Sequence, residues 1–64
     1  MPYRIEAGTR DEVINGFHEA VFVAQRWAMR MPGITVELFD LQSRLKLRSI
    51  WWDKEAGRLQ TVEY

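Results

Sequence analysis

Apolar and polar side chains alternate along three segments of the chain, as they do in strands that bury one face. These segments are residues 3–7, 34–40 and 45–52. Residues 58–64 are predicted to add a further strand, in which Leu59 and Val62 can both face inward only if the strand contains a bulge. The pattern therefore predicts four strands.

Apolar residues recur at helical spacing between the first two strands, which predicts one long amphipathic helix from Thr9 to Met31. Thr9 and Glu12 have the spacing of a capping box, in which each side chain accepts a hydrogen bond from the backbone N–H of the other residue. Pro32-Gly33 ends the helix, because proline disfavours helical geometry at the preceding residue. Gly16 is predicted to weaken the helix interior by up to about 1 kcal/mol relative to alanine.

The resulting order is strand, helix, strand, strand, strand, which predicts a single α+β domain over residues 1–64. We expect one long helix packed on one face of a three- to four-stranded sheet that is mixed and mostly antiparallel. A right-handed crossover through the helix should leave the first two strands parallel. Nothing remains in the chain to cover the opposite face of the sheet. This order at this length is similar to that of many small accessory proteins of bacteria and their phages, and no motif indicates one family.

The helix carries more apolar surface than one small sheet requires. One stripe should pack on the sheet: Val13, Phe17, Ala20, Val21, Ala24, Ala28 and Met31, with Ile14 and Trp27 at its margins. Beside it lies a second stripe, which we call the helix seam: His18, Phe22, Gln25 and Met29, with coiled-coil-like spacing. The seam either covers the edge of the core or binds a partner, most simply a second copy across a twofold axis.

A second candidate surface combines cations with aromatic side chains on the uncovered sheet face: Phe39, Arg44, Lys46, Arg48 and Trp52. Three interpretations remain open for this set. It can be a solvated strand face whose charges prevent edge-to-edge aggregation, a track for single-stranded nucleic acid, or a face that docks a protein, since tryptophan and arginine are enriched at binding hot spots. The formal net charge of zero and the lack of a ribonucleoprotein consensus favour the first over the second.

Composition narrows the chemistry further. Cysteine is absent, which excludes disulfides and cysteine zinc sites and suits a reducing cytoplasm. The single histidine has no neighbouring carboxylate that faces it along a helix, and neither serine lies in a nucleophile motif. No glycine-rich phosphate loop, signal peptide or membrane-spanning segment is present in the sequence. We therefore expect no catalytic residues, no metal and no cofactor.

These patterns predict a small cytoplasmic protein-interaction module that is not an enzyme and that self-associates, most simply as a homodimer. Its protein partner would bind the uncovered sheet face or the helix seam. The alternative is single-stranded nucleic-acid binding through Arg44, Lys46, Arg48 and Trp52.

Overall fold

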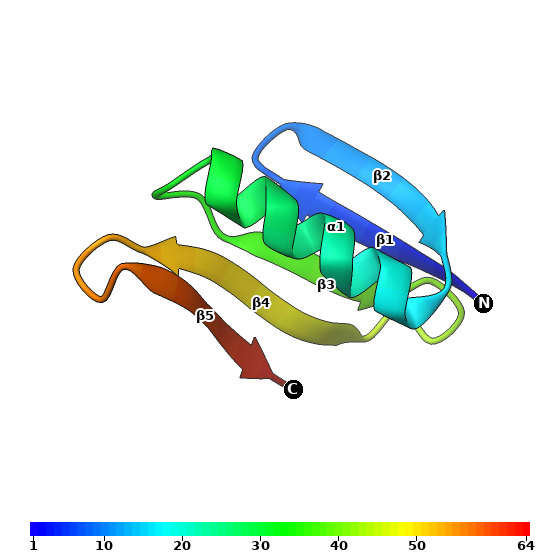
Figure 1. Ribbon diagram of the computed structural model, residues 1–64. Coiled ribbons are helices and arrows are strands. Elements are labelled where there is room, and N and C mark those ends of the chain that lie inside the picture. The colour runs from blue at the N-terminus through cyan, green and yellow to red at the C-terminus, as the bar shows by residue number, and fades with distance from the viewer.

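The computed structural model describes residues 1–64 and has one helix packed on one face of a five-stranded sheet (Figure 1). The strand order across the sheet is β2-β1-β3-β4-β5, and every neighbouring pair is antiparallel. No helix is long and apolar enough to cross a membrane. The elements are β1 (Pro2–Ala7), β2 (Arg10–Asn15), α1 (Phe17–Arg30), β3 (Val36–Asp40), β4 (Lys46–Asp53) and β5 (Arg58–Glu63).

The predicted α+β class is confirmed, and the predicted start of the helix is wrong. Residues 10–15 form β2, which pairs with β1 along its whole length through a tight turn that contains Gly8 at φ 62°. The capping box at Thr9 does not form, and α1 begins at Phe17, directly after Gly16. Residues 10–15 form a strand rather than a helix because cross-strand pairing satisfies their backbone hydrogen bonds and packs Ile14 against the core.

The predicted parallel pairing of the first strand with the strand after the helix is also wrong. The helix connects β2 to β3, and β1 lies between these two strands and runs antiparallel to both. The crossover therefore spans one intervening strand. The sheet contains no parallel neighbours, which corrects the expectation of a mixed sheet.

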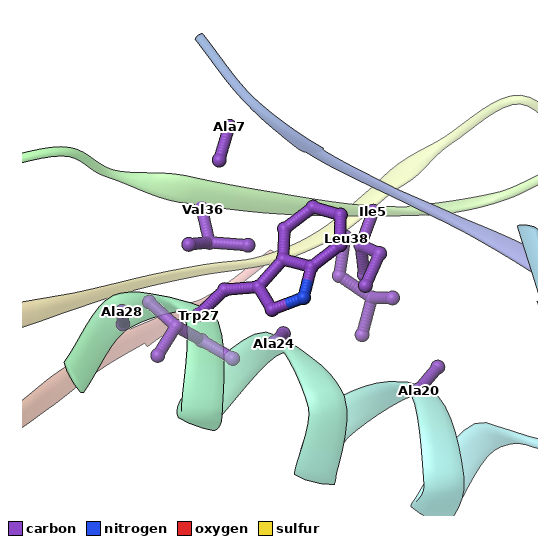
Figure 2. Packing of buried hydrophobic residues seen from close by; sticks show 9 residues of the cluster. Ile5, Ala7, Ala20, Ala24, Trp27, Ala28, Val36 and Leu38 are labelled. Carbon is purple, nitrogen blue, oxygen red and sulfur yellow. The ribbon is translucent and has the colours of Figure 1, made fainter. Parts of the chain in front are cut away.

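Three alanines allow the helix to approach the sheet closely. Ala20, Ala24 and Ala28 are fully buried and face the strands, as the sequence predicts, and Trp27 is 4 % exposed (Figure 2). The sheet contributes the larger aliphatic side chains to this core: Ile5, Val36, Leu38 and Ile50. Val13, which was predicted to lie on the core stripe, is 56 % exposed because it belongs to β2 and points away from the helix.

A bulge sets which residues of β4 face the helix. Leu38 pairs with Arg48, and the next residue of β3, Phe39, pairs with Lys46, so Leu47 is an extra residue in β4. Lys46 and Arg48 consequently point to opposite sides of the sheet, and the prediction that they share a side is wrong. The Arg48 guanidinium lies 5.0 Å from the centre of the Phe17 ring, on the helix side.

The last strand needs no bulge. Its pairing with β4 is regular from Arg58 to Glu63. Leu59 pairs with Trp52 and packs on the core, whereas Val62 pairs with Ser49 and points away from the helix. Leu59 and Val62 therefore lie on opposite faces of the sheet.

Candidate functional site

The side of the sheet opposite the helix is covered by no other element, and we call it the open face (Figure 1). Its members follow from the strand pairing, because residues directly opposite each other share a face. Ile5 is buried under the helix, so its neighbours Arg4 and Glu6 point to the open face. Two neighbouring rows cross the strands there. The basic row is Val13, Arg4, Phe39 and Lys46, and the acidic row is Asp11, Glu6, Glu37, Ser49 and Val62.

Ion pairs join the two rows within one molecule. Arg4 contacts the carboxylates of Glu6 and Asp11, each at 3.1 Å. Lys46 contacts Glu37 at 3.4 Å. These side chains are partly exposed, so each pair contributes at most about 1 kcal/mol to stability. The main effect of the pairs is that the charges of the open face are largely neutralised locally.

Ser49 links the acidic row to the end of the chain. Its hydroxyl donates to Glu37 at 2.5 Å and lies 2.8 Å from the hydroxyl of Tyr64. The backbone N–H of Tyr64 donates to the carbonyl of Leu47, and Lys46 lies 5.5 Å from the centre of the Tyr64 ring. Ser49 is only 5 % exposed, and this hydrogen bonding satisfies its hydroxyl. The network fixes the aromatic ring of Tyr64 on the open face.

Apolar and aromatic side chains surround these charges. Val13, Val62 and Tyr64 are exposed on the open face, and Phe39 and Trp51 are half-buried there. Phe39 and Tyr64 flank Lys46, whose ammonium lies about equally far from both ring centres. The open face therefore combines three aromatic side chains, a residue type enriched in protein interfaces, with charges that already have partners.

The structure divides the predicted sheet-face residues among three places. Phe39 and Lys46 lie on the open face, and Arg44 lies in the loop between β3 and β4. Arg48 and Trp52 face the helix side, and Arg48 forms an ion pair with Glu63 at 3.0 Å. The continuous track of three cations with Trp52 that the nucleic-acid alternative requires is therefore not assembled.

Sequence reasoning missed several members of the open face. Trp51 and Tyr64 are its two largest aromatic side chains, and Arg4 is its second cation. Trp51 was assigned to the buried side because simple alternation was applied along β4, and the bulge at Leu47 shifts that alternation by one residue. Arg4 could have been found from the alternation of β1 alone.

The four residues of the helix seam lie on the outer side of α1. All four are exposed, with Phe22 at 57 % and Met29 at 54 %. Arg26 lies over the Phe22 ring at 5.8 Å, and His18 packs edge-on against Phe17. The interpretation that the seam covers the edge of the core is not supported by these exposures, and its role as a contact surface stays a prediction.

Neither similar proteins nor a metal-binding or histidine site indicates a function for this chain. Comparison with protein-family models, with curated proteins and with solved structures finds no significant match for this chain. No group of three or more histidine or carboxylate side chains is close enough to hold a metal ion. His18 forms no ion pair, and the carboxylates of Glu6 and Glu37 lie on the opposite side of the sheet. Function is therefore argued from the surfaces of the chain itself.

Proposed function

We propose that the protein is a non-catalytic interaction module that associates with a second copy of itself through the open face. The observation that carries the proposal is the arrangement of charge on that face: Arg4 and Lys46 lie in one row, and the three carboxylates of Asp11, Glu6 and Glu37 lie in the next. Adjacent rows of opposite sign make the surface complementary to its own copy.

The symmetry that uses this complementarity is a twofold axis that runs between the two rows and parallel to them. Rotation about such an axis turns a second sheet face to face with the first and exchanges the rows. Arg4 of one copy then faces Glu6 of the other, and Lys46 faces Ser49, one strand away from Glu37. Twofold contacts of this kind use the same patch on both subunits and close after one step, so they form dimers rather than filaments.

The open face is large enough for a reversible dimer. Five strands about 4.8 Å apart, with six residues rising about 3.3 Å each, make a face of roughly 24 by 20 Å. Two copies would bury about 1,000 Å² in total, which is near the lower limit for specific interfaces. We therefore expect a weak dimer that exchanges rapidly.

The other two candidate surfaces receive less support from the geometry. The helix seam exposes two large apolar residues on a narrow stripe, whereas the open face presents five apolar or aromatic side chains across the sheet. A nucleic-acid track would need several cations in a row on one face, whereas Lys46 and Arg48 lie on opposite sides of the sheet and Arg44 lies in a loop.

Reversing one charge in either row should weaken the dimer. Glu6→Lys places a cation opposite Arg4 of the second copy, and the twofold axis repeats the repulsion, so we expect the dissociation constant to rise about tenfold. Arg4→Glu should have the same effect. Combining the two substitutions exchanges the rows at this position and should restore dimerisation. Sedimentation equilibrium over a concentration series measures the dissociation constant.

Two controls make this experiment decisive. Glu19→Lys applies the same charge change to an exposed position on the helix and should leave the dimer unchanged. Phe22→Glu tests the helix seam. If Phe22→Glu abolishes the dimer while both row variants keep it, the interface lies on the helix and the proposal is wrong. A wild-type protein that stays monomeric at millimolar concentration contradicts self-association through any surface.

Tryptophan fluorescence offers an independent test, because Trp51 and Trp52 are adjacent in sequence and face opposite sides of β4. Variants with phenylalanine at two of the three tryptophan positions each leave one reporter. Dimerisation should reduce acrylamide quenching of Trp51 and leave that of Trp52 unchanged. Equal protection of the two, or protection of Trp52 alone, would place the contact away from the open face.

A further inference from the structure

The structure contains one hollow, at the end of the open face where β3 turns into β4. Its volume is about 400 Å³, within the range of small-ligand sites. Arg4, Glu6 and Phe39 line it from the sheet, and Asp40, Leu41 and Arg44 line it from the loop. An aromatic residue, an aliphatic residue and two arginines therefore line one hollow.

The loop holds Arg44 in an unusual backbone conformation. Its φ is 63°, in the left-handed region, and it is the only residue other than glycine with a positive φ. Its backbone N–H donates to the carbonyl of Asp40 at 2.7 Å, and the Asp40 carboxylate accepts from the backbone N–H of Gln42 at 2.8 Å. Glycine would adopt this conformation without strain. Residues other than glycine in this strained region are concentrated at active and binding sites. The conformation therefore makes the Arg44 side chain a candidate ligand contact.

Arg44 is also the one arginine of the hollow whose charge has no partner in the molecule. Arg4 is already paired with Glu6 and Asp11, and the Asp40 carboxylate is occupied by the backbone of its own loop. Arg44 forms no ion pair and lies over no aromatic ring. An unpaired guanidinium beside Phe39 and Leu41 fits an anionic ligand that has an apolar part.

We propose that this hollow binds a carboxylate. The planar guanidinium of Arg44 pairs with the carboxylate, which it matches in geometry, and the apolar part of the ligand lies on Phe39 and Leu41. The carboxylate can belong to a free small molecule or to an acidic side chain of a protein. The inference does not require the dimer, because a single copy contains the whole hollow, although Arg4, Glu6 and Phe39 also belong to the two rows.

The test is a titration of the isotopically labelled protein followed by amide chemical shifts. The free small-molecule probe is 3-phenylpropanoate, and its neutral control is 3-phenylpropanamide. The protein-side probe is acetyl-Gly-Glu-Phe-amide, with the glutamine peptide as control. We expect saturable shifts at Phe39, Leu41 and Arg44 with at least one carboxylate probe and weaker shifts with its amide. The probe that responds identifies the source of the ligand.

Two substitutions of Arg44 separate binding from folding. Arg44→Gln removes the charge, and Arg44→Gly also relieves the left-handed backbone, so at least the second variant keeps a folded loop. Both should raise the dissociation constant of the carboxylate about fivefold or more. Arg58→Gln makes the same charge change at the far end of the sheet and should have no effect. The proposal is overturned if neither carboxylate gives saturable shifts, if the amides bind equally well, or if both Arg44 variants bind like the wild type.

Discussion

Replacing Leu38 with alanine is expected to lower the free energy of unfolding by about 2–5 kcal/mol. Leu38 is fully buried on β3, the central strand of the sheet, and it lies beneath the helix beside Ile5 (Figure 2). Its truncation removes apolar contacts from both layers and leaves a cavity that the alanine-lined helix cannot fill. Domains of this size rarely have more than about 3–5 kcal/mol of stability, so the variant should be largely unfolded at room temperature.

Urea denaturation followed by circular dichroism measures this loss. Val13→Ala is the matched control, because Val13 is apolar and lies in a strand but points to the open face and is 56 % exposed. Its effect should stay within about 0.5 kcal/mol. A Leu38→Ala protein that unfolds at the same urea concentration as the Val13→Ala protein would contradict the assignment of the core to the helix side of the sheet.

The layers of the fold were predictable from the sequence because apolar periodicity and helix-stop signals are local. The stripe of Ala20, Ala24 and Ala28 correctly predicts which side of the helix meets the sheet, and Pro32-Gly33 correctly predicts the end of the helix. A single helix can cover one face only, so the uncovered face also followed from the element count.

The start of the helix was not predictable in the same way. Residues 10–15 carry a capping-box spacing and place Val13 in phase with the helix stripe, so they suit a helix locally. They become a strand because Gly8 allows a tight turn back along β1, and because six pairs of residues then align between the two strands. That pairing is a tertiary effect, which overrides local helix propensity.

The candidate site was predictable only in part, and for a related reason. Uncovered aromatic and basic residues on the sheet were expected, but one extra residue at Leu47 decides which of them share a side. Alternation read without the bulge places Arg48 and Trp52 on the open face and Trp51 beneath the helix. The charge rows that support self-association depend on the strand order, which places β1 beside β3. No local pattern specifies that order.

Replacing Gly16 with alanine tests where the helix starts, because the two possible starts predict opposite signs for the change in the free energy of unfolding. In a helix that began at Thr9, Gly16 would lie in the interior, and Gly16→Ala would stabilise the protein by up to about 1 kcal/mol. In the structure Gly16 joins β2 to α1 with φ 99° and ψ 126°, and its backbone N–H donates to the carbonyl of Met1. This conformation is costly for any residue with a β-carbon, so Gly16→Ala should instead destabilise the protein by about 1–3 kcal/mol.

The cause of that loss can be isolated, because a β-carbon at position 16 would meet no atom within 4 Å. Steric clash with neighbours is therefore excluded, and only the backbone conformation contributes. The matched pair Gln25→Ala and Gln25→Gly measures the same alanine–glycine exchange at an exposed position inside α1, where alanine should be favoured by about 1 kcal/mol. Urea denaturation of the four proteins should give opposite signs at positions 16 and 25. The same sign at both would mean that position 16 is helical and that β2 does not form.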